Sequence, residues 1–539
     1  MGQINGGKIV VDTLESLNVE SIFGIPGIHN LDIYDALINS KIKHVTARHE
    51  QGAGYMADGY ARITGKPGIA LVITGPGLTN IITPMGQAFH DSIPMVVISS
   101  QVPTWALDQR VGFLHELKNS TILTKSVAKD SRMVSKVGDI GIYLKEAYYL
   151  SLSGRPGPVH VEIPMDILRD AAEESYANKE NRTPSFSKII NIDPRLLELS
   201  INKINKSSKP VIIVGGGGCK AHMQIKQLAE RINGAVVQTC AGKGVVDEEH
   251  PLCLGTRIHF QAVRQFLKTA DLVIAVGTEL SPTDLWEVPL QLDGEMIQID
   301  VDAANFNRNF RAHIGLKGDA ERILNLLLTS VSKKKRNNAR EEELKEIIEL
   351  TQTELSETTG ISEGLEHISS MLSEVRKFLP HDGIIFTDMT TPAYIALSSY
   401  SCNQPKTFIH PVGFGTLGYA LPAAIGAKIT KRDKKICVLV GDGGFQFTCQ
   451  ELAVACQEKL TLPIIIWNDN GFGEIRRHQE RRHPGQRIAV DHLNPDFIKL
   501  AEAYGIKGTR VNTPSELANA LREAFLQQHP VIIEVRCGR

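Results

Sequence analysis

The sequence has no excess of charge of either sign and no long apolar segment. Its 539 residues include 59 Lys and Arg against 60 Asp and Glu, a formal net charge of −1, so no overall field would attract nucleic acid or an anionic membrane. No apolar run approaches the ~20 residues that a membrane-spanning helix needs. The first residues carry no apolar signal core, and position 6 is Gly where N-myristoylation requires Ser or Thr. We therefore expect a cytoplasmic protein with neither a nucleic-acid nor a membrane partner.

Cysteine is also sparse. The eight residues are scattered, and no two of them have CxxC spacing. This pattern argues against a zinc site or a disulfide framework and predicts reduced thiols, several of them buried. No segment repeats at the period of a solenoid protein.

Short apolar runs alternate with amphipathic stretches throughout the chain. Each run ends at Gly or a polar turn, as in IALVITG (69–75), DLVIAVGTEL (271–280) and KICVLVGDGG (435–444). Such runs are typical of fully buried parallel strands, and their alternation with helical patterns predicts an α/β fold. A chain of this length needs more than one core, so we expect three domains, each a mostly parallel sheet flanked by helices. Their expected limits are 1–175, 190–330 and 360–539.

Two polar segments separate these blocks. Residues 174–190 have no pattern and are predicted to be a linker. Residues 333–357 are densely charged, which favours a solvated helical linker. The middle block opens with KPVIIVGGGG (209–218), whose Gly run resembles a nucleotide-binding loop, but a tight strand-to-helix turn is the favoured interpretation.

Acidic and glycine residues follow two of the apolar runs in the third block. Asp442, Gly443 and Gly444 come directly after the run KICVLV and Gly441, and Asp469 follows a second run, LPIIIWN, 27 residues after Asp442. Open α/β sheets bind ligands at the carboxyl ends of their strands. The two glycines let the backbone approach a diphosphate, and carboxylates are ligands that Mg²⁺ prefers. The spacing therefore predicts a diphosphate and Mg²⁺ site, and two ordinary turns rich in Asp and Gly are the alternative.

Three further segments extend this pattern: HEQGA (49–53), the stretch from TGPGLTN to SSQVP (74–103), and PVGFGTLGYALPAAIGA (411–427). With the GDGG turn, they resemble the thiamine diphosphate (ThDP) enzymes of the acetolactate synthase and 2-oxo acid decarboxylase family. The resemblance covers most of the chain. It implies a ThDP-binding fold at both ends and a Rossmann-like domain between them. It also implies a homodimer or homotetramer whose active sites lie between chains.

The resemblance assigns roles in cofactor binding residue by residue. Two asparagines follow the GDG turn in the family motif; Asn468 matches the first, and Asp469 replaces the second, which binds the metal. The carbonyl of Gly471 would complete the protein ligands of Mg²⁺. The carbonyl of Gly415 would accept a hydrogen bond from the 4′-amino group of ThDP, and Leu417 would wedge under the cofactor and bend it. Taken alone, Leu417 is more typical of an ordinary core residue.

Glu50, in the HEQGA segment, is the expected catalytic acid. ThDP becomes a nucleophile when its C2 proton passes to the cofactor's own 4′-imino group, and a carboxyl group bonded to N1′ favours that tautomer. In the family, the matching glutamate serves a cofactor held by the third domain of the partner chain. The alternative is a first-turn residue that the helix dipole favours.

The middle block departs from the flavin-binding members of the family. Acetolactate synthases bind FAD there through a Met-His-Gly run and an arginine after a strand. This chain has LCLGTRIHF (252–260) and AVGTELSPTD (275–284) instead, with Glu279 in place of the arginine. These departures argue against FAD, so ThDP and Mg²⁺ are the expected cofactors.

The segment after the metal-binding turn bears on the substrate. It has the sequence GEIRRHQERR (473–482), whereas acetolactate synthases carry mostly apolar residues and a Trp. Glu474 would pair with a guanidinium group in two-pronged geometry. Three other segments, LHEL (114–117), HEQGAG (49–54) and GTEL (277–280), resemble the 2-ketoarginine (5-guanidino-2-oxopentanoate) decarboxylase subgroup, which handles an oxo acid with a cationic tail. His115, in LHEL, is the candidate proton donor or carboxylate-positioning group.

The expected function is non-oxidative, ThDP- and Mg²⁺-dependent decarboxylation of a small-molecule 2-oxo acid, with 2-ketoarginine as an example of a cationic substrate. Acetolactate synthase activity, which joins two 2-oxo acids, is the enzymatic alternative. An inactive ThDP-fold regulatory protein is the other, and the presence of Glu50, Asp442 and Leu417 argues against it.

Overall fold

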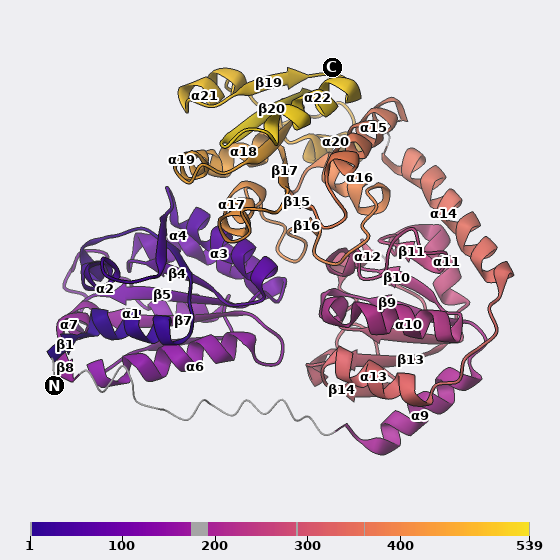
Figure 1. Cartoon of the computed structure of the whole chain (residues 1–539), viewed down its shortest axis with the longest axis horizontal. Coiled ribbons are helices and arrows are strands. Elements are labelled where there is room, and N and C mark those ends of the chain that lie inside the picture. The colour runs from indigo at the N-terminus through magenta and orange to yellow at the C-terminus, as the bar shows by residue number, and fades with distance from the viewer. Residues whose placement is uncertain (1–2, 174–191, 287–288, 360–361, 538–539) are drawn as a thin grey trace.

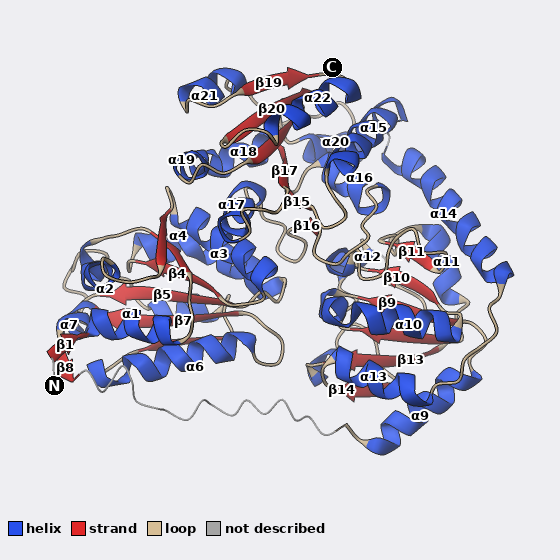
Figure 2. Cartoon of the chain, in the orientation of Figure 1, coloured by secondary structure: helices blue, strands red, loops and turns tan. Residues whose placement is uncertain are grey.

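The computed structural model describes residues 3–173, 192–286, 289–359 and 362–537, and these contain three six-stranded sheets with helices on their faces (Figure 1, Figure 2). The strands of the three sheets pair in parallel. The predicted α/β fold with three mostly parallel sheets is confirmed. The linker predicted at 174–190 lies outside the described residues.

The N-terminal sheet has the order β3-β2-β4-β5-β7-β6, which is 2-1-3-4-6-5 when its strands are counted along the chain. The strands are β2 (Ser21–Gly24), β3 (Lys43–Thr46), β4 (Gly68–Val72), β5 (Met95–Gln101), β6 (Asp130–Met133) and β7 (Pro158–Pro164). The helices are α1 (Gly6–Ser16), α2 (Leu31–Leu37), α3 (Glu50–Thr64), α4 (Pro76–His90), α5 (Ser120–Lys125), α6 (Ile140–Leu152) and α7 (Met165–Arg169). A short antiparallel pair, β1 (Gln3–Asn5) and β8 (Ala171–Glu173), joins the two ends of this domain.

The middle sheet has the order β11-β10-β9-β12-β13-β14, or 3-2-1-4-5-6 along the chain, which is the Rossmann order. The strands are β9 (Pro210–Val214), β10 (Ala235–Gln238), β11 (Cys253–Gly255), β12 (Leu272–Val276), β13 (Glu295–Asp300) and β14 (Ile314–Lys317). The helices are α9 (Pro194–Lys206), α10 (His222–Ile232), α11 (Gln261–Lys268), α12 (Pro282–Leu285) and α13 (Ala320–Ser330).

The C-terminal sheet, β16-β15-β17-β18-β20-β19, repeats the 2-1-3-4-6-5 order of the N-terminal sheet. The strands are β15 (Ile384–Thr387), β16 (Phe408–Ile409), β17 (Ile436–Gly441), β18 (Leu462–Asn468), β19 (Gly508–Val511) and β20 (Pro530–Arg536). The helices are α15 (Ser362–Phe378), α16 (Thr391–Ser399), α17 (Ala420–Thr430), α18 (Asp442–Thr448), α19 (Leu452–Gln457), α20 (Gly473–Arg482), α21 (Phe497–Ala503) and α22 (Pro514–Ala524). In both end domains the order reverses between the first and third strands, and such switch points are where open α/β sheets bind ligands.

The N-terminal and C-terminal domains of one chain meet along α3 and α17, which lie side by side (Figure 1). Their backbones approach so closely that only glycine fits at two positions. A Cβ on Gly59 would lie 1.9 Å from the carbonyl oxygen of Ala423, and one on Gly426 would lie 1.9 Å from that of Met56. Small residues in both helices therefore set the distance between the two domains.

The charged segment 333–357 forms most of α14 (Asn338–Thr359), which runs from the middle domain toward the C-terminal domain (Figure 1). This agrees with the prediction of a helical linker. Among the described residues, no helix combines the length and the apolar character needed to cross a bilayer.

Candidate active site

Two carboxylates meet at the carboxyl edge of the C-terminal sheet. Asp442 begins α18 directly after β17, and Asp469 follows β18, the neighbouring strand. Asp442 is buried, and burial together with the charge of Asp442 raises the pKa of Asp469 to about 6. A carboxyl group whose ionisation is opposed by burial and by a neighbouring carboxylate is stabilised in its charged form by a bound cation. The residues present therefore fit the predicted metal site.

A hydrogen-bond network fixes the position of Asp442. Its Oδ2 accepts from the backbone amide of Gly471, at 2.9 Å, and from the side chain of Asn494, at 2.6 Å. Asn494 also donates to Oδ1 of Asn468, at 2.9 Å, and Asn468 donates to the buried Glu534, at 2.7 Å. Sequence reasoning missed Asn494 and Glu534, because neither directly follows a strand end nor belongs to a motif.

Arg476 stabilises the turn after β18 through hydrogen bonds to its backbone. Its guanidinium donates to the carbonyl oxygens of Asp469, at 3.3 Å, and Asn470, at 3.1 Å, and pairs with Asp491. The described residues contain no cluster of three or more His, Cys, Asp or Glu side chains arranged for a metal. The side chains thus offer two carboxylates, which suits Mg²⁺ because that ion usually takes few protein ligands together with phosphate oxygens and water.

The Gly415–Leu417 turn is anchored by an acid that sequence reasoning missed. Asp388 follows β15 at the switch point and accepts from the amides of Gly418 and Ala420, both at 3.2 Å. Burial raises the pKa of Asp388 to about 6, and these amides oppose the shift. Gly415 and Gly418 have φ values of +65° and +77°, which favour glycine. Leu417 is half-buried beside them. The end-of-strand rule that identified Asp442 would also have found Asp388.

Glu50 begins α3 at the carboxyl edge of the N-terminal sheet. One of its oxygens accepts from Nδ2 of Asn80 on α4, at 2.9 Å, a partner that sequence reasoning missed. The nearby Glu451 is buried and accepts from the amide of Arg48, and burial raises its pKa to about 7, with a smaller contribution from Glu50. Glu50 is half-buried, so its carboxyl group remains accessible at this edge.

His115 lies on the same edge as Glu50. A Cβ added to Gly75, which precedes α4, would lie 2.7 Å from Cβ of His115. The backbone of His115 is in the left-handed region, with φ +66°, a conformation that costs free energy for a residue other than glycine. Its ring lies next to that of His29, with 5.1 Å between centroids.

Glu474 lies near the C-terminal edge, but its carboxylate is already engaged. It forms an ion pair with Arg477 and lies 3.4 Å from Nε2 of His478, and its side chain is 33% exposed. Arg477 also donates to Oγ1 of Thr391, which begins α16 after β15. Glu474 therefore lies close to the start of α16, and a cationic substrate would have to compete with Arg477 for it.

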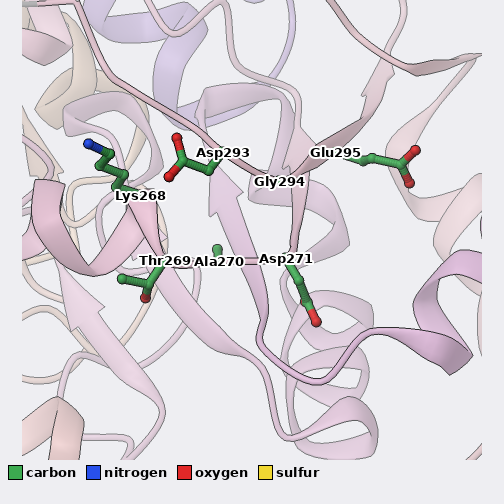
Figure 3. Close-up of a pocket in the computed structure, with 7 residues that line it drawn as sticks. All are labelled: Lys268, Thr269, Ala270, Asp271, Asp293, Gly294 and Glu295. Carbon is green, nitrogen blue, oxygen red and sulfur yellow. The ribbon is translucent and has the colours of Figure 1, made fainter.

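A shallow depression in the middle domain is separate from these residues (Figure 3). It is lined by Lys268, Thr269, Ala270, Asp271, Asp293, Gly294 and Glu295. Two of its acids have protein partners, since Asp271 accepts from Ser208 and Glu295 pairs with Lys203. It lies at the amino ends of β12 and β13, opposite the edge where such sheets bind ligands.

Comparison with known proteins agrees with this geometry. Three family models match the chain: the N-terminal TPP binding domain of thiamine pyrophosphate enzymes over residues 4–122, their central domain over 197–327, and their C-terminal TPP binding domain over 388–535. Thiamine pyrophosphate (TPP) is another name for ThDP.

Curated relatives match along the whole chain. A probable 2-ketoarginine decarboxylase of Pseudomonas aeruginosa is 36% identical, over 99% of this chain and 95% of the relative. A probable acetolactate synthase large subunit of Methanococcus aeolicus is 30% identical, over 98% and 92%. The mitochondrial acetolactate synthase catalytic subunit of Saccharomyces cerevisiae is 33% identical, over 99% and 81%. The resemblance identified from the sequence is confirmed, and the chain belongs to the thiamine pyrophosphate enzyme family.

Proposed function

We propose that the protein catalyses non-oxidative, ThDP- and Mg²⁺-dependent decarboxylation of a 2-oxo acid with a cationic side chain, such as 2-ketoarginine. The observation that carries this proposal is the placement of two carboxylates, Asp442 and Asp469, directly after neighbouring strands at the ligand-binding edge of the C-terminal sheet, where burial and the charge of Asp442 raise the pKa of Asp469. The similarity to a probable 2-ketoarginine decarboxylase supports the substrate class.

Each site residue has a defined task in this proposal. Asp442, Asp469 and the carbonyl of Gly471 bind Mg²⁺, and Gly443 and Gly444 allow the diphosphate to approach the backbone. Gly415 and Leu417 orient the other end of the cofactor, and Glu50 supplies the acid that activates it. The bound cofactor contributes the electron sink that lets the bond between the oxo-acid carbonyl carbon and its carboxylate break.

His115 is proposed to hold the proton that is delivered to the carbon that has lost CO₂. Its loop lies against Gly75, on the same sheet edge as Glu50. An imidazole can give up a proton near neutral pH, which is the property a general acid needs.

Glu474 is proposed to bind the cationic tail of the substrate, in competition with Arg477. The ion pair that Glu474 forms in the free protein keeps its carboxylate from being buried without a partner. A guanidinium substrate would then exchange one cationic partner for another. This exchange predicts selectivity for cationic substrates rather than very tight binding.

Acetolactate synthase activity is the second candidate, because two of the relatives carry that name. The position of Glu279 argues against the flavin of those enzymes, since this carboxylate forms ion pairs with Arg155 of the N-terminal domain and with Arg308. Absorbance near 450 nm of the purified protein tests for a flavin directly, and we expect none.

Two observations support an active site shared between two copies of the chain. Asn80 on α4 holds Glu50, whereas Gln87, seven residues further along α4, accepts from Thr416 beside Leu417. Seven helical residues rise ~10 Å, so Glu50 and the Leu417 turn of one chain are held at different points along α4. In addition, Ile28, Trp105 and Leu114 are 60%, 65% and 55% exposed near Glu50's edge, as is typical of a surface that another chain covers.

Complementation between inactive variants tests the shared site. Glu50→Gln and Asp442→Ala chains, co-expressed with different tags, form hybrids in which one of two sites has both residues intact. A statistical mixture should then recover about a quarter of native activity, since half of the dimers are hybrids. A site built within one chain would give no recovery, and a monomeric mass by light scattering would equally exclude the proposal.

The substrate proposal is tested by CO₂ release from a panel of 2-oxo acids. We expect 2-ketoarginine to exceed pyruvate in kcat/KM and to yield the aldehyde. Formation of an acetohydroxy acid from pyruvate would favour the synthase alternative. Absence of turnover with ThDP and Mg²⁺ bound would favour an inactive regulatory protein.

A further inference from the structure

His29 occupies the switch point of the N-terminal sheet. It belongs to the short 3-10 helix η1 (Ile28–Asn30), which follows β2. The strands on either side of β2 are β3, which leads to Glu50, and β4, which leads to Gly75. The corresponding point of the C-terminal sheet carries Asp388 and Asp442. By the general rule for open α/β sheets, this is a position where ligand chemistry is expected.

The His29 side chain is buried and poorly partnered. It is 1% exposed, and within the described part of the chain neither ring nitrogen has a partner of good hydrogen-bond geometry, although the backbone of Leu114 lies close enough to act on the pKa of His29. The Nδ1 atom of His115 is likewise buried and unpaired. Buried polar groups are nearly always bonded, so three such nitrogens in adjacent rings require an explanation.

The arrangement of the His29 and His115 rings suggests an explanation for these unpaired nitrogens. Their centroids are 5.1 Å apart with a tilt of 34°, and Phe113 packs against His29 at 6.1 Å. A neutral imidazole offers one donor and one acceptor nitrogen, and an imidazolium offers two donors. At this separation a nitrogen of one ring comes within hydrogen-bond reach of a nitrogen of the other only when both rings turn a nitrogen toward each other.

Burial, more than the surrounding charges, favours the neutral form of His29. Burial lowers the pKa of His29, and His115 and Arg169 lower it further, while the backbone at Leu114 acts in the opposite direction. Arg169 is itself paired with Asp32, at 3.5 Å. A neutral His29 can accept a hydrogen bond from a protonated His115, and two charged rings this close would repel.

We propose that His29 is a positioning residue that accepts a hydrogen bond from Nδ1–H of His115 and leaves Nε2–H as the proton available to the substrate. The inference deepens the proposed function, in which His115 is the proton donor. In the protonation step, Nε2 of His115 transfers its proton to the carbon that has lost CO₂. His115 becomes neutral, its Nδ1–H stays bonded to His29, and solvent restores the Nε2 proton before the next turnover.

Four variants of the holoenzyme test this inference: His29→Phe, which keeps a ring without nitrogens; His29→Asn, which keeps an acceptor oxygen; His115→Gln; and the His29→Phe/His115→Gln double variant. With the best substrate of the 2-oxo acid panel, His29→Phe should lower kcat about 10- to 100-fold with KM within about twofold. The alkaline side of its pH–rate profile should move to lower pH, since the protonated donor loses its acceptor. His29→Asn should restore most of the rate and the native profile.

The double variant separates positioning from packing. Because His29 acts through His115, the double variant should be no slower than His115→Gln alone. Multiplicative losses, or a His29→Phe protein with a native pH profile, would overturn the proposal.

If His29→Phe does not fold, ¹⁵N spectra of the native holoenzyme with labelled histidine still show whether Nδ1–H of His115 is hydrogen-bonded. A hydrogen-bonded Nδ1–H on His115 is expected, and a non-bonded one would contradict the idea. Proton exchange at C2 of bound ThDP should be native in every His29 variant. If the native protein itself showed no proton exchange at C2, the proposed function would be contradicted, but the pairing of His29 with His115 would not.

Discussion

The two end domains share one strand order and differ in the residues that directly follow their strands. After the first, third and fourth strands, the C-terminal domain has Asp388, Asp442 and Asp469, whereas the N-terminal domain has Ile25, Ile73 and Val102. One edge is therefore acidic and suited to a metal and a diphosphate. The other edge has apolar residues at these three positions, and Glu50 enters it from the end of the second strand.

The comparison teaches that topology fixes where a ligand edge lies, while a few residues after the strands decide what it binds. In the proposed function the two edges are complementary. The acidic edge holds the charged end of the cofactor, and the apolar edge meets its ring with a single carboxyl group.

The largest effect is expected from removing Asp442, the acid that follows the third strand of the C-terminal domain. Asp442→Ala should lower the affinity for ThDP and Mg²⁺ by about a hundredfold or more, because no neutral group replaces a buried carboxylate at a cation. Isothermal titration with ThDP and Mg²⁺ measures this loss. Unchanged affinity would show that the acidic edge is not the metal site.

On the N-terminal side, Glu50→Gln should act on chemistry rather than on binding. The variant should retain ThDP, because the diphosphate end is untouched, and should lose about 10²- to 10⁴-fold in C2 proton exchange. Asn80→Ala is the matched control: it removes the partner of Glu50 but not the acid, so its loss should be smaller. A native exchange rate in Glu50→Gln would remove Glu50 from the mechanism.

Glu474 tests whether the acidic edge also selects the substrate. Glu474→Gln should lower kcat/KM for 2-ketoarginine about tenfold and spare pyruvate, since a charged hydrogen-bond partner is lost. Arg477→Met removes the competing cation and should leave or improve the use of 2-ketoarginine. Equal losses on both substrates would show that Glu474 has a structural role at this turn.

Asp469→Asn is expected to have a smaller effect, because an amide oxygen can still bind Mg²⁺. Thermal shift with ThDP and Mg²⁺ should therefore still show stabilisation of this variant. If Asp469→Asn did not bind the cofactor while Asp469→Ala bound it normally, Asp469 would not be the second ligand.

Much of this site could be predicted from sequence, because its residues stand at strand ends. Asp442 and Asp469 each follow an apolar run, whereas Glu50 was found from its HEQGA motif, and the structure has all three at the carboxyl edges of their sheets. The side chains that hold them could not be predicted in the same way. Asn494, Asn80 and Glu534 reach the site from loops, a helix and a distant strand, and such contacts depend on the tertiary fold.

His29 and Glu474 mark the limits of that reasoning. His29 has no motif around it, and only its burial and its missing partners distinguish it. Glu474 was expected to offer a carboxylate to the substrate, but it already pairs with Arg477. The i,i+3 spacing of these two residues in α20 is the local signal that could have indicated this ion pair.

The smallest expected difference between the two end domains concerns their sixth strands along the chain, β7 and β20. Glu162 is the fifth residue of β7, and Glu534 is the fifth residue of β20. Each accepts, at 2.7 Å, from the amide that ends the fourth strand, Gln101 in one case and Asn468 in the other. Glu534 also pairs with Arg510 and Arg536, whereas Glu162 accepts hydrogen bonds from the neutral side chains of Gln101 and Ser120.

This difference predicts an opposite response to loss of charge at the two positions. Burial raises the pKa of Glu162 from 4.5 to about 7, so the folded state binds a proton that the unfolded state releases between these values. Stability therefore falls as pH rises from 4.5 to 7, by about 3 kcal/mol at most from this group.

Glu162→Gln should abolish this decline and raise Tm at pH 8 relative to the native protein. Glu534→Gln, which loses two ion pairs, should lower Tm at the same pH. Denaturation followed by circular dichroism from pH 5 to 8 measures both, and a Glu162→Gln protein that is less stable than native at pH 8 would show that Glu162 is ionised and well solvated by its partners.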